Sequence, residues 1–105
     1  GQIYNSVYCA SKGGVNLLTK ALAVEFATRG VRVNAVCPGG VNTPLAKNFR
    51  VPENPELPVF GRLMPLVQPV AEPAEIAGAV AYLASEEARF ITGDSLTIDG
   101  GQTVS

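Results

Sequence analysis

Histidine is absent from all 105 residues of this chain, and so is tryptophan. Ser-His and Cys-His nucleophiles and the commonest general acid/base all need an imidazole, so none of that chemistry comes from these residues. Any proton transfer carried out here must use a tyrosine, a lysine or a carboxylate.

An excess of charge and a long apolar run are also missing. Eight Lys and Arg are spread along the chain against nine Asp and Glu, which gives a net charge of −1. This balance predicts no nucleic-acid partner and no binding to an anionic membrane surface. No apolar run approaches the roughly 20 residues that cross a bilayer, and the first residues do not resemble a signal peptide. We therefore expect no membrane association and a cytoplasmic location.

Cysteine is scarce. Cys9 and Cys37 lie far apart, without a paired C-x-x-C motif and without histidine. This pattern argues against a metal site, and it leaves a disulfide open without requiring one. Buried free thiols are the simplest interpretation.

What is present begins with a helix. Asn5 and Ser6 are good N-cap types, the following segment to Thr28 contains no proline, and Gly30 is a C-cap signal. One apolar stripe and a second apolar side predict a helix that is buried on two sides, one against a sheet and the other against a partner subunit. The stripe is Val15, Leu18, Leu22 and Phe26, and the second side is Leu17, Ala21 and Val24.

The remaining elements follow from where β-branched, proline, glycine and acidic residues stand along the chain. A β-branched run at 31–37 predicts a buried strand that stops at Pro38-Gly39-Gly40. A long proline-rich loop comes next, with short helical pieces around 43–49. Proline after Glu72 and an acidic first turn start a second helix over 73–85, and a last strand at 95–99 ends at Gly100-Gly101.

This order of elements predicts an α/β fold. Two strands joined through a helix form a right-handed crossover and lie parallel. A parallel sheet of two strands cannot cover the helices packed on it, and no strand precedes the first helix. We expect either that a missing part of the domain lies upstream, in a truncated or fragmentary sequence, or that another polypeptide completes the sheet.

Tyr8 and Lys12 are the candidate proton-handling pair. A separation of four on a helix places both side chains on one face, about one turn apart, and Tyr8 falls in the first turn. A nearby ammonium and the positive end of the helix dipole both favour the phenolate, which predicts a lowered tyrosine pKa. Alone, the Y-x-x-x-K spacing is weak, because an amphipathic tyrosine beside a solvated lysine is common.

Three further segments carry a family resemblance. YCASKGG, VRVNAVCPGGVNTP and PAEIAGAVAYLASEEARFITGDSLTIDGG follow one another in the order and spacing of the short-chain dehydrogenase/reductase family. The resemblance covers nearly the whole chain and weakens at 45–71. It implies the C-terminal part of a Rossmann-like, doubly wound parallel sheet without the N-terminal dinucleotide-binding half. The parts are a catalytic helix (1–30), a strand and nicotinamide-side turn (31–44), a substrate loop (45–72) and a helix with the last strand (73–105).

The resemblance also implies roles. Tyr8 matches the catalytic acid/base, and Lys12 matches the residue that lowers its pKa and bonds the nicotinamide ribose. Residues that line the nicotinamide, NAD or NADP, match Pro38, Gly39, Val41 and Thr43. The family's catalytic serine, relay asparagine and glycine-rich phosphate loop have no match, and Ser6 is better explained as a cap.

The implied activity is hydride transfer between NAD(P)(H) and a small alcohol or ketone. The implied assembly is a homodimer or homotetramer through the first helix and the C-terminal helix and strand. We expect the 105 residues to be inactive alone; the alternative is a non-enzymatic or truncated relative that serves in binding or assembly.

Two polar residues are predicted to be structural. Asn34, expected in mid-strand, is a candidate for hydrogen bonding within the fold. Asp99, before Gly100-Gly101, is expected to end its strand and tie down the C-terminus.

Overall fold

The computed structural model describes residues 5–48 and 65–104. The elements are helix α1 (Ser6–Phe26), a 3-10 turn (Ala27–Arg29), strand β1 (Ala35–Pro38), helix α2 (Pro44–Lys47), helix α4 (Pro73–Ala84), a second 3-10 turn (Glu86–Ala88) and strand β2 (Ser95–Ile98). This is the predicted order, with α2 inside the span where short helical pieces were expected. Residues 49–64 of the predicted substrate loop lie outside the described residues.

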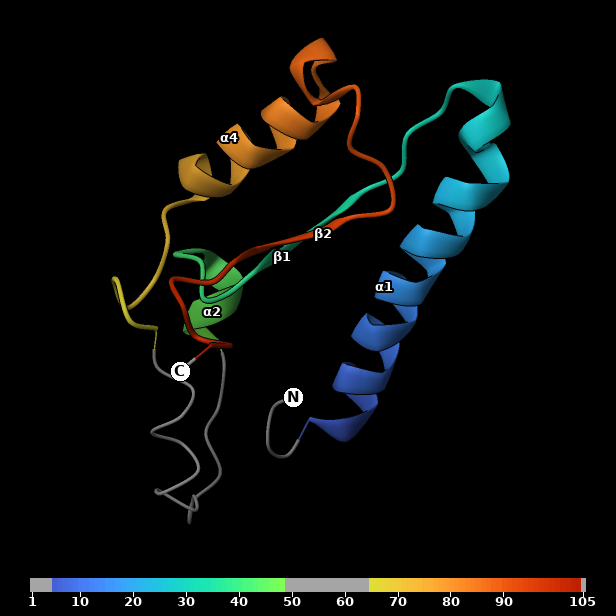
Figure 1. Ribbon diagram of the computed structural model, residues 1–105. Coiled ribbons are helices and arrows are strands. Elements are labelled where there is room, and N and C mark those ends of the chain that lie inside the picture. The colour runs from blue at the N-terminus through green and yellow to red at the C-terminus, as the bar shows by residue number, and fades with distance from the viewer. Residues whose placement is uncertain (1–4, 49–64, 105) are drawn as a thin grey trace.

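The two strands pair in parallel, and their register runs from Ala35 opposite Ser95 to Pro38 opposite Ile98. Figure 1 shows α1 and α4 on opposite sides of this two-stranded ribbon. Helices on both faces of parallel strands are the arrangement of an α/β fold. The predicted fold class is therefore confirmed.

Strand β1 is shorter than predicted, because residues 33 and 34 bond to the turn at 91–94 instead of a strand. Gly93, in the left-handed region with φ of 77°, donates its N–H to the carbonyl of Val33 at 2.7 Å. Asn34 lies before β1, where its amide donates to the carbonyl of Ile91 and accepts from the N–H of Asp94. Its predicted structural role is confirmed, although the position in mid-strand was wrong.

Helix α1 ends as the sequence predicts. The 3-10 turn closes on Gly30, whose φ of 70° places it in the left-handed conformation that favours glycine. Of the two predicted cap residues, Asn5 occupies the N-cap position, whereas Ser6 is the first helical residue. Ser6 is therefore not the cap.

The face of α1 that meets the strands is not the predicted stripe. Thr19 and Ala23 are the buried residues of the helix, and Asn16 accepts hydrogen bonds from Cys37 at 3.6 Å and Ser95 at 3.4 Å. The large apolar residues flank this narrow polar and small-residue face on both sides, so that Val15, Leu17, Leu18 and Val24 are exposed. The buried face of α1 is thus made of small and polar side chains, whereas hydrophobic size alone indicated a neighbouring face.

Helix α4 is anchored at both ends. Pro73 occupies its first turn, and the Glu75 carboxylate accepts from the N–H of Glu72 at 2.7 Å. At the other end, the Arg32 guanidinium donates to the carbonyls of Leu83 at 2.8 Å and Ser85 at 3.2 Å. A cation that bonds the last carbonyls of a helix stabilises that end.

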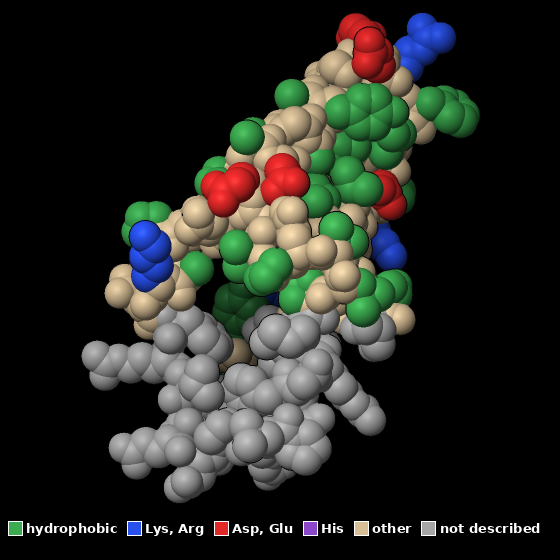
Figure 2. Space-filling view, turned by 90° about the vertical axis from the view of Figure 1, so that its left-hand side faces the viewer, with side chains coloured by type: hydrophobic (Ala, Val, Ile, Leu, Met, Phe, Trp, Pro, Cys, Tyr) green, Lys and Arg blue, Asp and Glu red, His purple; other side chains and the backbone are tan. Residues whose placement is uncertain are grey.

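Little of the described chain is buried. Its buried hydrophobic residues are Ala23, Leu83 and Ala88, while Phe90 is fully exposed. Figure 2 views the α4 side and shows hydrophobic side chains gathered over it, with a few acidic ones between them. Within the described part of the chain, no helix is both long and apolar enough to span a bilayer.

Candidate functional site

The candidate site lies at the end of the sheet where the parallel strands terminate. A crossover helix runs back along the strand that follows it, so its N-terminus lies near the strand's carboxyl end. Figure 1 shows this arrangement, with the start of α1 and the turn after β1 toward the same end of the molecule. Open α/β sheets bind ligands at this end.

Tyr8 and Lys12 meet on α1 as predicted. The Lys12 Nζ lies 5.5 Å from the centroid of the Tyr8 ring. Both side chains are exposed, Tyr8 to 54%, and the neighbouring Ser11 hydroxyl turns back to donate to the Tyr8 carbonyl at 2.8 Å. The phenol and the ammonium thus share one accessible patch in the first two turns of the helix.

The turn after β1 is held by a single parallel bridge between Val41 and Ala71. Ala71 donates its N–H to the carbonyl of Gly40, and Asn42 donates its N–H to the carbonyl of Ala71, both at 2.8 Å. In a parallel bridge of this kind, the bonds use the peptide groups on either side of the bridged residue. The N–H and C=O of Val41 itself therefore point to the opposite side of the chain.

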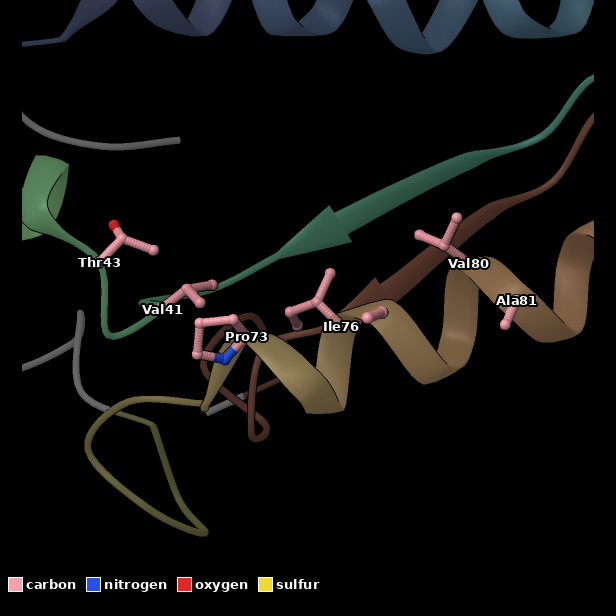
Figure 3. Close-up of a pocket in the computed structure, with 7 residues that line it drawn as sticks. Val41, Thr43, Pro73, Ile76, Val80 and Ala81 are labelled. Carbon is pink, nitrogen blue, oxygen red and sulfur yellow. The ribbon is translucent and has the colours of Figure 1, made fainter.

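Thr43 starts helix α2. Its side-chain oxygen accepts from the N–H of Ala46 at 3.4 Å, which makes it the N-cap, with Pro44 in the first turn. Thr43 and Val41 also border an open apolar groove of about 620 Å³, whose other wall is α4. Figure 3 shows the two residues on the turn, with Pro73, Ile76 and Val80 presented by the helix.

Gly39 is a glycine because of the chain's own packing. A Cβ atom on Gly39 would lie 2.9 Å from the Cα of Asp99, which is closer than real Cβ atoms come. The Gly39 N–H is also engaged, since it donates to the carbonyl of Ile98 at 3.0 Å. The missing side chain at Gly39 therefore clears space for the turn that follows β2.

Asp99 organises that turn. Its carboxylate accepts from the Thr103 hydroxyl at 2.7 Å and from the N–H groups of Gly101 and Thr103. The bond from the Thr103 hydroxyl holds the pKa of Asp99 below its ordinary value, and the two backbone donors act in the same direction. Its predicted role of tying down the C-terminus is confirmed.

Cys9 and Cys37 form no disulfide, as in the simplest interpretation, but they are half-buried where full burial was expected. Cys37 uses its sulfur to bond Asn16. Among residues 5–48 and 65–104, no three His, Cys, Asp or Glu side chains come together in a way that could hold a metal ion.

Sequence reasoning missed two sets of polar contacts that hold the ends of α4. One is Arg32, which ties the entry to β1 to the end of α4. The other joins Asn42 of the turn to Glu72 at the start of α4, at 3.0 Å. A single charged residue inside a β-branched run was a signal for the first; the second pair is 30 residues apart and had no local signal.

Comparison with known proteins identifies a matching family and a similar solved structure. A family model described as Enoyl-(Acyl carrier protein) reductase matches residues 1–103. The crystal structure of a short chain dehydrogenase from Mycobacterium paratuberculosis bound to NAD superposes with a TM-score of 0.84 at 35% identity, over 99% of this chain. The chain belongs to the short-chain dehydrogenase/reductase family.

Two relatives within this family are dehydrogenases by name. The chain is 48% identical over 98 residues to 3beta-hydroxysteroid dehydrogenase 1 of Eggerthella lenta, which covers 92% of this chain. It is also 48% identical over 101 residues to galactitol 2-dehydrogenase (L-tagatose-forming) of Cereibacter sphaeroides, which covers 96% of it. The family is thus one of oxidoreductases, and the solved relative with NAD bound supports a nicotinamide dinucleotide as its cofactor.

The chain spans only part of the length of these relatives. It covers 36% of the steroid dehydrogenase, 39% of the galactitol dehydrogenase and 41% of the solved mycobacterial chain. It therefore corresponds to part of a short-chain dehydrogenase domain, as predicted.

Proposed function

We propose that this chain supplies the catalytic pair and the nicotinamide-side turn of an NAD(P)-dependent oxidoreductase. The reaction is hydride transfer between the dinucleotide and a small alcohol or carbonyl compound. The observation that carries the proposal is the accessible Tyr8–Lys12 patch, which stands at the same end of the sheet as the turn that follows β1.

Tyr8 is the acid/base in this proposal. When an alcohol is oxidised, its hydroxyl proton passes to the Tyr8 oxygen as the hydride leaves the carbon, and a carbonyl group forms; reduction reverses both transfers. The nicotinamide supplies or accepts the hydride. Lys12 favours the phenolate through its charge and donates to ribose hydroxyls, since an ammonium carries three donors and no acceptor.

The turn residues Pro38, Gly39, Val41 and Thr43 are proposed to border the nicotinamide. A carboxamide offers one acceptor and two donors. The N–H and C=O of Val41, turned away from the bridge to Ala71, match both kinds of group. The Thr43 hydroxyl adds a further donor and acceptor two residues on. The residues present therefore fit this part of the cofactor.

We also propose assembly into a homodimer or homotetramer through α1, α4 and β2. The exposed residues Val15, Leu17, Leu18 and Val24 on α1, with Val80, Tyr82 and Phe90 on and after α4, support it. Isolated surface leucines and valines are ordinary, but this many on two helices of one small chain are not. The boundaries of the four parts of the domain and a cytoplasmic location stay predictions.

The test is Tyr8→Phe in the native gene product that contains this chain. We expect kcat to fall by about 100-fold to 10,000-fold, the usual contribution of a positioned acid/base. The dissociation constant for NADH or NADPH should not change, because the ring and Lys12 remain. Turnover is followed by nicotinamide absorbance, and binding by nicotinamide fluorescence.

Tyr82→Phe is the matched control, since Tyr82 is a partly exposed tyrosine on α4. It should leave turnover unchanged. Full activity in the Tyr8→Phe protein would refute the role of Tyr8, and a gene product that binds neither NADH nor NADPH would refute the proposed function.

A further inference from the structure

The turn that carries Val41 and Thr43 is joined to the start of α4 twice. The first connection is the backbone bridge, in which Ala71 bonds Gly40 and Asn42 on either side of Val41. The second is a side-chain bond, because the Asn42 Nδ2 donates to the Glu72 Oε1 at 3.0 Å. Ala71 and Glu72 are adjacent in sequence, so both connections fix the turn to one short segment.

That segment is itself held in place. The Glu75 carboxylate accepts from the N–H of Glu72 at 2.7 Å and from the Gln68 side chain at 2.9 Å. Helix α4 follows directly, and the Arg32 guanidinium holds its far end through the carbonyls of Leu83 and Ser85. Asn42 thus bonds to a carboxylate whose backbone is fixed by neighbouring groups, and this is what a positioning contact needs.

The geometry of the groove depends on this contact. Val41 and Thr43 form one wall, and Pro73, Ile76 and Val80 of α4 form the other (Figure 3). Asn42 lies between the two wall residues of the turn, and Glu72 directly precedes the first wall residue of the helix. A change in the Asn42–Glu72 distance therefore moves one wall relative to the other.

We propose that Asn42 and Glu72 are a positioning pair, which sets Val41 and Thr43 in the orientation that receives the nicotinamide carboxamide. This inference rests on the function proposed above. Both residues are exposed, and exposed polar contacts add little to folding stability. The pair therefore acts on binding geometry, with little effect on whether the chain folds.

A reciprocal exchange of the amide group and the carboxylate group tests the pair in the native gene product. Asn42→Asp places a second carboxylate against Glu72, so the bond is lost and the turn is pushed away. We expect the dissociation constant for the bound nicotinamide dinucleotide to rise by about fivefold, within the range of couplings between contacting residues. Glu72→Gln alone keeps an acceptor oxygen and should change the dissociation constant by less than about twofold.

The double variant Asn42→Asp with Glu72→Gln restores a donor opposite an acceptor and has the same net charge as the wild type. It should return the dissociation constant to within about twofold of the wild-type value. Asn48→Asp, at the exposed C-cap of α2, is the control for an added negative charge and should have no such effect. The melting temperatures of all variants should agree closely.

Two results would overturn the proposal: unchanged affinity in Asn42→Asp, or a double variant that binds no better than Asn42→Asp. Hydrogen exchange of the backbone N–H groups of residues 42 and 71 gives a readout that needs no cofactor. Exchange should be faster in Asn42→Asp and return to the wild-type rate in the double variant. If the wild type binds no dinucleotide, the proposed function fails, and unaltered exchange rates would then refute the positioning pair separately.

Discussion

At the scale of single residues, Lys12 has two proposed roles. Because its side chain is exposed, one substitution should remove both roles without affecting folding. Its ammonium lies 5.5 Å from the Tyr8 ring, and its side chain is exposed. In the proposed reaction it favours the phenolate and also bonds the ribose. Lys12→Ala should therefore lower kcat/KM by about 100-fold or more. It should also weaken dinucleotide binding about tenfold, as expected for the loss of a charged hydrogen bond.

A loss of both turnover and dinucleotide affinity distinguishes Lys12→Ala from Tyr8→Phe, which should lower turnover alone. Lys20→Ala is the matched control, because Lys20 is an exposed lysine farther along α1. Steady-state kinetics and fluorescence titration measure the two effects. A Lys12→Ala protein with normal affinity but lost turnover would show that the ribose contact is not made by this residue.

Single residues were predictable where one side chain acts on its neighbours in sequence. Asp99 bonds groups two and four positions ahead, and such local contacts follow from residue type. Arg32 was missed because its partners, Leu83 and Ser85, are about fifty residues away. The roles of Tyr8 and Lys12 remain predictions, although their spacing on α1 and their mutual contact follow from the helix itself.

At the scale of elements, Gly39 is the point where the end of β1 meets the turn after β2. Gly39→Ala would place its Cβ 2.9 Å from the Cα of Asp99, and backbone atoms cannot swing aside as a flexible side chain can. We expect the free energy of unfolding to fall by about 1–3 kcal/mol, as for other overpacked sites. Denaturant unfolding of the native gene product measures this change.

The paired substitution is Gly78→Ala in α4, where no atom lies within 4 Å of the added Cβ. Because alanine is the better residue inside a helix, stability should rise by about 0.5–1 kcal/mol. The two substitutions add the same methyl group and should have opposite signs. A neutral or stabilising Gly39→Ala would mean that the two turns are not packed together.

Element types were predictable because each rests on a local pattern: a proline and an acidic residue in the first turn of α4, a glycine after α1, and short runs that stop at glycine pairs for the strands. The packed face of α1 was not predictable. The large apolar residues indicated Val15 and Leu18, yet the buried residues are Thr19 and Ala23, and Asn16 is the residue that bonds the strands. Hydrophobic pattern reports which faces avoid water, and it does not say which of two apolar faces a given partner covers.

At the scale of the whole molecule, the described residues bury few large side chains. Leu83 and two alanines are the buried hydrophobic residues of residues 5–48 and 65–104, against an extensive exposed apolar surface on α1 and around α4. A core of this size offsets little of the conformational entropy that folding removes. Further protein surface is needed to cover these helices, which is consistent with a chain that spans 36% to 41% of three of its relatives.

The last prediction concerns the 105 residues expressed by themselves. Their sequence contains no G-x-x-x-G-x-G turn. This is the type of loop that holds the dinucleotide phosphates in the short-chain dehydrogenase/reductase family. Tyr8, Lys12 and the Val41–Thr43 turn can contact only the nicotinamide end of the cofactor, and most of its charge lies in the phosphates. We therefore expect no NAD(P)H-dependent turnover from the isolated chain at concentrations where a gene product that carries such a loop is active. Measurable turnover by the purified 105 residues would show that the dinucleotide is bound by groups other than the phosphate loop.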